Sequence, residues 1–118
     1  MNNYHSKLMT IIDGIRPDME TLGYFAFGGG GDIDALRNCF IRSYEAALEA
    51  KKLYEQTFPD TPLPELDALC GHDTDISPIE EFYNHLKSDD FMPMPFDAEH
   101  YSNYTMVLNG LFIALQQA

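Results

Sequence analysis

Apolar side chains recur at helical spacing in four segments of this chain, and this pattern constrains its fold more than any other feature. The period of about 3.6 residues that is typical of an α-helix runs through residues 4–15, 32–57, 78–88 and 97–115. No stretch alternates apolar and polar residues convincingly over the roughly 4–8 positions of a half-buried strand. The sequence therefore predicts an all-α fold, a small helical bundle of four or five helices.

Glycine and proline mark the expected ends of the first helix. Gly14 and Pro17 should end or kink it, and a short second turn from Asp18 to Leu22 should follow Pro17. Residues 24–27 (Tyr-Phe-Ala-Phe) are apolar without a helical period. They fit either a short strand or a packed loop.

The long helix over residues 32–57 is the clearest element in the pattern. Asp32 can cap its start, and Pro59 stops it. Arg42 and Glu45 are three residues apart on its polar side, so we expect them to form an exposed ion pair.

The middle of the chain is rich in proline. Four of the seven prolines lie between residues 57 and 78, which predicts a stiff proline-rich connection with one helical turn from Pro64 to Cys70. The next helix has a complete start signal, because Ser77 can cap it, Pro78 suits its first position and Glu80 completes a capping box. We predict a helix over residues 78–88.

Asp97 should cap a final helix that carries apolar side chains along one broad face. Gly110 would let a neighbouring helix approach closely, so we expect this helix to be central in the bundle. An apolar C-terminal helix can close its own bundle or that of a dimer, and the oligomeric state therefore stays open.

The length of 118 residues and the apolar fraction of 45% allow one hydrophobic core, so we expect residues 1–118 to form a single acidic helical domain. No stretch approaches the ~20 apolar residues of a membrane span, and the N-terminus lacks the apolar core of a secretory signal. These features favour a cytoplasmic protein. Cys39 and Cys70 are then expected to be reduced and mostly buried thiols.

Charge is distributed unevenly along the chain. Nineteen acids and seven bases give a net charge of −12, and residues 59–118 contribute eleven of the acids but only one base, Lys87. Such a chain is unsuited to binding nucleic acid or an anionic membrane. A basic protein partner fits it, because fixed carboxylates steer a cationic surface to encounter.

Acidic residues interleaved with tyrosines in the second half form the predicted binding face. Tyrosines supply desolvated anchors, and carboxylates supply orientation and association rate. Asp89 and Asp90 stand out because they follow a helix C-terminus, where the dipole favours cations. The predicted partner-binding residues are Asp73, Asp75, Glu80, Glu81, Tyr83, Asp89, Asp90, Asp97, Glu99 and Tyr101.

Two patterns that suggest bound ligands are weak. Gly28 to Gly31 precede a helix start but lack the Gly-Lys-Ser/Thr ending of a phosphate loop, and Asp32 would repel an anion. Glu81 and His85 lie on the same side of one helix and could join His72 at a metal. The neighbouring acids do not match a calcium loop, and HExxH is absent. We therefore predict no cofactor and no metal.

The leading hypothesis is a stoichiometric inhibitor of the immunity or anti-defence type. It would occlude a basic partner, such as a nuclease toxin or a nucleic-acid-binding enzyme, through the acidic face. The alternative is an adaptor or assembly subunit that docks through an apolar surface, such as residues 91–96 or 24–27. A small metal-dependent enzyme around His72 and His85 is a third hypothesis. Because no nucleophile elbow or tuned pair of carboxylates accompanies these residues, we predict a protein that is not an enzyme.

Overall fold

The computed structural model describes residues 3–26, 33–70, 78–88 and 97–118. This part of the chain forms five helices and no strand, which confirms the predicted all-α bundle. The helices are α1 (Tyr4–Ala26), α2 (Ile33–Thr57), α3 (Pro64–Cys70), α4 (Pro78–Leu86) and α5 (Asp97–Gln117).

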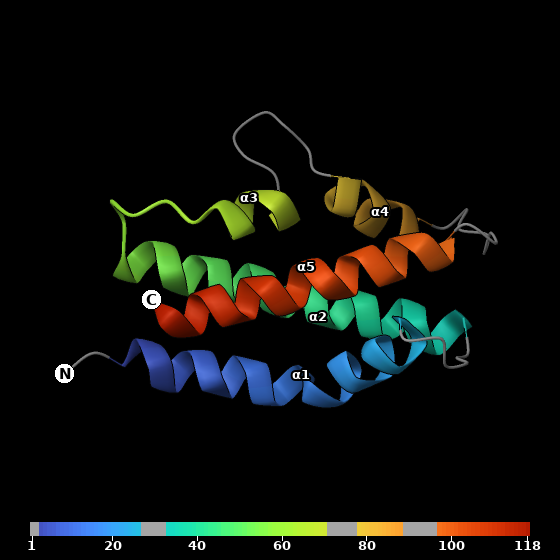
Figure 1. Ribbon diagram of the computed structural model, residues 1–118, viewed down its shortest axis with the longest axis horizontal. Coiled ribbons are helices and arrows are strands. Elements are labelled where there is room, and N and C mark those ends of the chain that lie inside the picture. Colours follow the sequence, from blue (N-terminus) through green and yellow to red (C-terminus); the bar gives the residue numbers. More distant parts are fainter. Residues whose placement is uncertain (1–2, 27–32, 71–77, 89–96) are drawn as a thin grey trace.

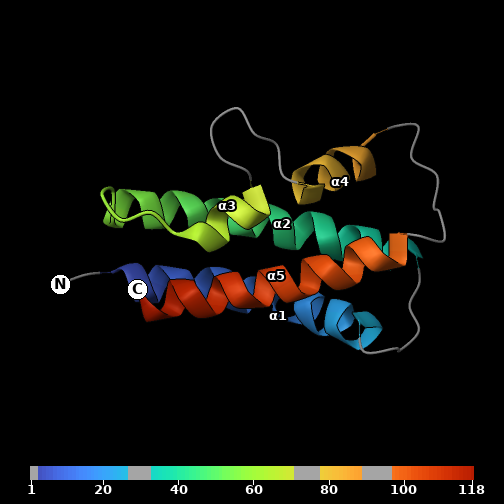
Figure 2. The same ribbon diagram turned by 45° about the horizontal axis from the view of Figure 1, so that its top comes forward.

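The three long helices run side by side along the longest dimension of a molecule that measures 46 × 31 × 22 Å (Figure 1). The direction of α1 is opposite to that of α2 and α5, as the colour order in Figure 1 shows. The short helices α3 and α4 form a second layer, in which α3 packs on α5 and α4 packs on α2 (Figure 2). Because α5 touches all four other helices, it is central in the bundle as predicted.

Aromatic rings fill much of the core. The largest fully buried side chains include Tyr4, Phe40, Tyr44, Tyr101 and Tyr104. The rings of Phe40 and Tyr104 lie 4.0 Å apart between centroids, which joins α2 to α5. Aromatic contacts of this kind add about 0.5–1.5 kcal/mol beyond the burial of their area.

The predicted break in the first helix is wrong, because α1 continues through Pro17 to Ala26. Its axis bends along the way, which agrees with the alternative of a kink (Figure 1). Ile15 and Leu22 are both buried, so α1 packs on the core before and after the proline. Tertiary packing therefore outweighs the ~3 kcal/mol that an interior proline costs a helix.

Residues 24–26, which we expected to form a strand or a loop, are the last turn of α1. Phe27 lies outside the described residues. Phe25 packs edge-on against Tyr101, with 6.1 Å between the ring centroids, whereas Tyr24 is 66% exposed. Successive side chains on a helix point about 100° apart, so Phe25 can contact α5 while Tyr24 faces solvent.

Gly110 does not have the role that we predicted for it. It is exposed, and a Cβ atom built on it would meet nothing within 4 Å, so none of the described helices packs against it. The neighbouring Ile113 is 57% exposed. The closest packing of α5 is on its opposite side, where Leu108, Leu111 and Leu115 are buried.

Candidate protein-binding face

Helix α4 carries the central part of the predicted face. Its apolar stripe of Ile79, Phe82 and Leu86 is buried, which follows from their i, i+3 and i+7 spacing. Phe82 meets the ring of Phe40 edge-on at 5.2 Å and stacks on His100 at 4.6 Å. The helix is therefore held against both α2 and α5.

The half-buried Tyr83 joins α4 to α2 by a second set of contacts. Its ring stacks on Tyr44 with 4.3 Å between centroids, and its hydroxyl donates a hydrogen bond of 3.0 Å to Oε2 of Glu45. Tyr83 therefore helps to hold α4 against α2. Only the part of the ring that is not covered by Tyr44 can serve as an anchor for a partner.

Lys87 lies beside an acid of α2. Its ammonium group lies 3.5 Å from Oε2 of Glu45 and 3.3 Å from the hydroxyl of Tyr83. These contacts raise the pKa of Lys87, first through the hydrogen bond to Tyr83 and then through the charge of Glu45. The single base of residues 59–118 is therefore paired with an acid from the first half of the chain.

The C-terminal end of α4 is tied to α2 by an arginine. Nε of Arg37 donates a hydrogen bond of 2.7 Å to the carbonyl oxygen of Leu86. A cation at this end of a helix complements the dipole and satisfies a carbonyl that the helix leaves open. Arg37 and Tyr83 together hold α4 in one orientation on α2.

The predicted partner-binding residues fall into three groups. Glu80 is half-buried on α4, and Glu81 is exposed there. Asp97 and Glu99 belong to the first turn of α5, in a part of the helix whose side chains are not described. The remaining acids lie outside the described residues. They are Asp73, Asp75, Asp89 and Asp90.

Tyr101 does not lie on the face that we predicted. It is 1% exposed and packs against Phe25, Phe40 and Phe82 in the core. The acids around it in sequence suggested a surface position, but its place in the apolar stripe of α5 turns it inward. Tyr101 is a core residue in this structure and is removed from the proposed face.

The residues of the predicted metal site are only partly described. Within the described ranges, no three His, Cys, Asp or Glu side chains gather closely enough to hold a metal ion. Glu81 and His85 are both exposed on α4. His72 lies outside the described residues, as do the glycines 28–31. The structure therefore tests neither the proposed metal site nor the glycine loop.

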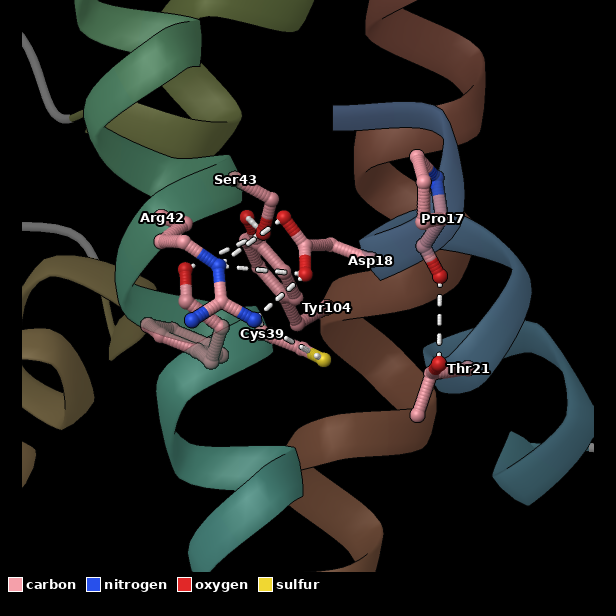
Figure 3. A network of polar contacts seen from close by, with 8 residues as sticks. Pro17, Asp18, Thr21, Cys39, Arg42, Ser43 and Tyr104 are labelled. Atoms are coloured by element: carbon pink, nitrogen blue, oxygen red, sulfur yellow. Dashed lines mark hydrogen bonds and ion pairs between the residues drawn. The ribbon is translucent and has the colours of Figure 1, made fainter. Parts of the chain in front are cut away.

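A polar cluster between α1 and α2 was not predicted (Figure 3). Asp18 is buried and accepts hydrogen bonds from Nε of Arg42 at 3.1 and 3.2 Å and from Nη2 at 2.6 Å. Arg42 thus pairs with Asp18 and not with Glu45, which correspondingly binds Tyr83 and Lys87. The expected Arg42–Glu45 pair is therefore wrong, because a buried carboxylate on α1 competes for the guanidinium.

Cys39 lies at the edge of this cluster as a free, buried thiol. Burial raises its pKa, and the neighbouring Asp18 carboxylate raises it further. Nη2 of Arg42 approaches its sulfur at 3.8 Å. A raised pKa keeps the thiol protonated at neutral pH, so Cys39 packs as a small apolar side chain and is not an activated nucleophile.

Comparisons with protein-family models, with curated proteins and with solved structures found no match. Function is therefore argued from this chain's own residues. Within the part of the chain that the structure describes, none of the helices combines the length and apolar character needed to cross a membrane.

Proposed function

We propose that this protein is a binding module that inhibits a basic protein partner by covering its cationic surface. The observation that carries the proposal is the charge of residues 59–118, which hold eleven acids and one base. Lys87 is the one base among them, and its ammonium group lies 3.5 Å from Oε2 of Glu45. The second half therefore presents a strongly negative field to any approaching protein.

The attachment of α4 supports a preformed binding face. Arg37, Tyr83 and Phe82 connect α4 to neighbouring helices, so the exposed Glu81 projects from a fixed helix. A face that is ordered before binding loses less conformational entropy when the partner docks. Acidic residues precede and follow α4 in the sequence, and we propose that they bind the same partner.

The chemistry of the partner follows from charge complementarity. An acidic protein binds best to a surface that is rich in lysine and arginine. Such surfaces are typical of proteins that bind phosphate backbones. We therefore propose a nuclease toxin or another nucleic-acid-binding enzyme as the partner, and an immunity or anti-defence role for this protein. The two proteins would meet in the cytoplasm, and the proposed action requires no catalytic step by this chain.

The test is capture of partners from a cell lysate at low and at physiological salt. The variant Glu81→Gln/Asp89→Asn/Asp90→Asn removes three acids from the proposed face. The control variant Glu49→Gln/Glu55→Gln/Asp60→Asn removes three acids from exposed positions of α2 and the turn after it. Both variants change the net charge by the same amount, so a difference between them reports the position of the acids and not the total charge.

We expect the wild type and the control to capture a basic protein at equal stoichiometry and to block its binding to nucleic acid. The face variant should capture much less of it, and the complex should weaken as salt screens the charges. Equal capture by both variants, or a captured protein that still binds nucleic acid, would contradict the proposal.

An adaptor function is the second candidate, because the structure leaves apolar side chains exposed. Tyr24 is 66% and Met106 is 74% exposed. Docking through such side chains responds little to salt, in contrast to the acidic face. A partner that is captured equally at both salt concentrations, and lost when Tyr24 is changed to serine, would favour the adaptor.

A further inference from the structure

Two side chains from different helices lie side by side at the contact between α2 and α4. Glu45 extends from α2 and Tyr83 from α4, and the Tyr83 hydroxyl donates a hydrogen bond of 3.0 Å to Oε2 of Glu45. The hydroxyl oxygen can still accept, and a carboxylate offers about four lone pairs. The pair therefore presents acceptor oxygens and a negative charge to a cation. We name it the Glu45–Tyr83 site.

The ammonium group of Lys87 occupies this site in the structure. Its Nζ lies 3.3 Å from the Tyr83 hydroxyl oxygen and 3.5 Å from Oε2 of Glu45. The distance from Nζ to the centroid of the Tyr83 ring is 5.3 Å, so the ammonium group sits at the hydroxyl end of the ring. The protein's own side chain thus shows that the site accepts a cation.

The contact of Lys87 with the site is loose. A charge-assisted N–H···O hydrogen bond is about 2.7–2.9 Å long, whereas Nζ is 3.5 Å from the carboxylate oxygen of Glu45. The side chains of Lys87 and Glu45 are each 49% exposed, and exposed ion pairs are weak. The backbone N–H of Lys87 bonds to the carbonyl oxygen of Tyr83 at 3.2 Å. Rotation of the lysine side chain therefore opens the site without moving the backbone.

The acceptor groups are held more firmly than the lysine. The ring of Tyr83 stacks on Tyr44 with 4.3 Å between centroids, and Nε of Arg37 fixes the end of α4 through a bond of 2.7 Å to the carbonyl oxygen of Leu86. Glu45 lies in the middle of the long helix α2. The site therefore keeps its shape when the ammonium group leaves, which lowers the entropic cost of binding another cation.

We propose that the Glu45–Tyr83 site binds an arginine side chain of the partner, and that Lys87 covers the site until this arginine displaces it. The inference rests on the proposed function, in which the partner is basic. A planar guanidinium can donate two N–H groups to the Glu45 carboxylate and lie against the uncovered part of the Tyr83 ring. The ammonium group of a partner lysine would only replace an identical group. Arginine is therefore the residue that gains by the exchange.

This role of Lys87 differs from that of a structural link. If Lys87 only held α4 on α2, removing it would weaken the site or leave its affinity unchanged. If Lys87 competes with the incoming arginine, removing it should strengthen binding, because the arginine no longer has to displace a bound cation. The direction of the change separates the two roles.

The test is titration of the full chain at low salt with the capped peptide Gly-Gly-Arg-Gly-Gly, followed by NMR of the backbone amides. Lys87→Met removes the competing cation, and Lys52→Met removes an exposed lysine of α2, so both variants lose one positive charge. We expect Lys87→Met to bind the peptide about two- to fivefold more tightly than wild type, which is the factor by which an exposed ion pair competes. Lys52→Met should bind like wild type.

A second pair of variants tests the carboxylate. Glu45→Gln removes its charge, and Glu55→Gln removes the same charge from another exposed position of α2. We expect Glu45→Gln to lower the affinity for the peptide about fivefold, and Glu55→Gln to leave it close to that of wild type. The peptide with lysine in place of arginine should bind more weakly. The amides that shift should belong to α4 and to the part of α2 around Glu45.

Two results would overturn the proposal. One is an affinity of Lys87→Met no higher than that of Lys52→Met, and the other is equal binding of the arginine and lysine peptides. Failure here is distinguishable from failure of the proposed function. Capture of a basic protein that neither Glu45→Gln nor Lys87→Met alters would keep the proposed function and reject this site. Peptide binding as expected, with no basic protein captured from a lysate, would support the site and contradict the proposed function.

Discussion

Breaking the contact between Asp18 and Arg42 should destabilise the fold by an intermediate amount. The Asp18 side chain is 11% exposed, whereas that of Arg42 is 57% exposed. Removing one partner of a fully buried pair costs about 3–5 kcal/mol, and an exposed pair contributes about 0.2–1 kcal/mol. Because only the carboxylate is buried, we expect Arg42→Met to lower the free energy of unfolding by about 2 kcal/mol.

The assay is urea denaturation followed by far-ultraviolet circular dichroism, because the chain has no tryptophan. The control is Arg16→Met, which removes an ion pair of 2.7 Å to Asp13 whose two side chains are 56% and 63% exposed. We expect this control to change the free energy of unfolding by less than about 0.5 kcal/mol. Replacing both partners, with Asp18→Leu and Arg42→Met, should recover part of the loss because no charge stays buried. Equal effects of Arg42→Met and Arg16→Met would refute the reasoning.

Three further predictions concern α1. Burial raises the pKa of Tyr4 to about 12 in the folded protein. In the unfolded chain this tyrosine loses its proton at a lower pH, so the free energy of unfolding should fall as pH rises from about 10 towards 12. Tyr4→Phe should reduce this alkaline loss in unfolding curves, and exposed Tyr24→Phe should leave it unchanged. Pro17→Ala should stabilise the protein by about 1 kcal/mol or more, since alanine restores the missing N–H donor; a lower melting temperature would show that packing depends on the bend. Gly14→Ala meets nothing within 4 Å and should stabilise by about 0.5–1 kcal/mol, which an unchanged urea midpoint would contradict.

The sequence predicted a helix correctly where residues close to it in sequence specify its ends. Helix α3 has the bounds predicted from its proline and the following glycine, and α4 begins at Pro78 as predicted. Capping and periodicity act over three or four residues, so they are readable without tertiary information. The same signals failed at Pro17, because the packing of α1 on two neighbouring helices outweighs a local helix breaker.

The candidate site was predicted less completely than the fold. The positions of acids in sequence identified α4 as part of a charged region, and Glu81 is exposed there. Sequence could not tell that Tyr101 is buried while Tyr83 is half-buried, because both lie at apolar positions of their own helices. Which tyrosine faces solvent depends on the helices that cover it.

The sequence by itself determined the all-α class, the helices other than the second half of α1, and the concentration of acid in the second half of the chain, because composition and short-range spacing set these properties. Tertiary structure alone decided the partners of the charged side chains. Arg42 pairs with Asp18 across 24 positions, and Lys87 pairs with Glu45 across 42. It also decided that one side of α5 closes the core while Met106 and Ile113 on another side stay exposed. The partner of a side chain depends on which helices pack together. The packing of the helices minimises the free energy of the whole bundle and not that of any one segment.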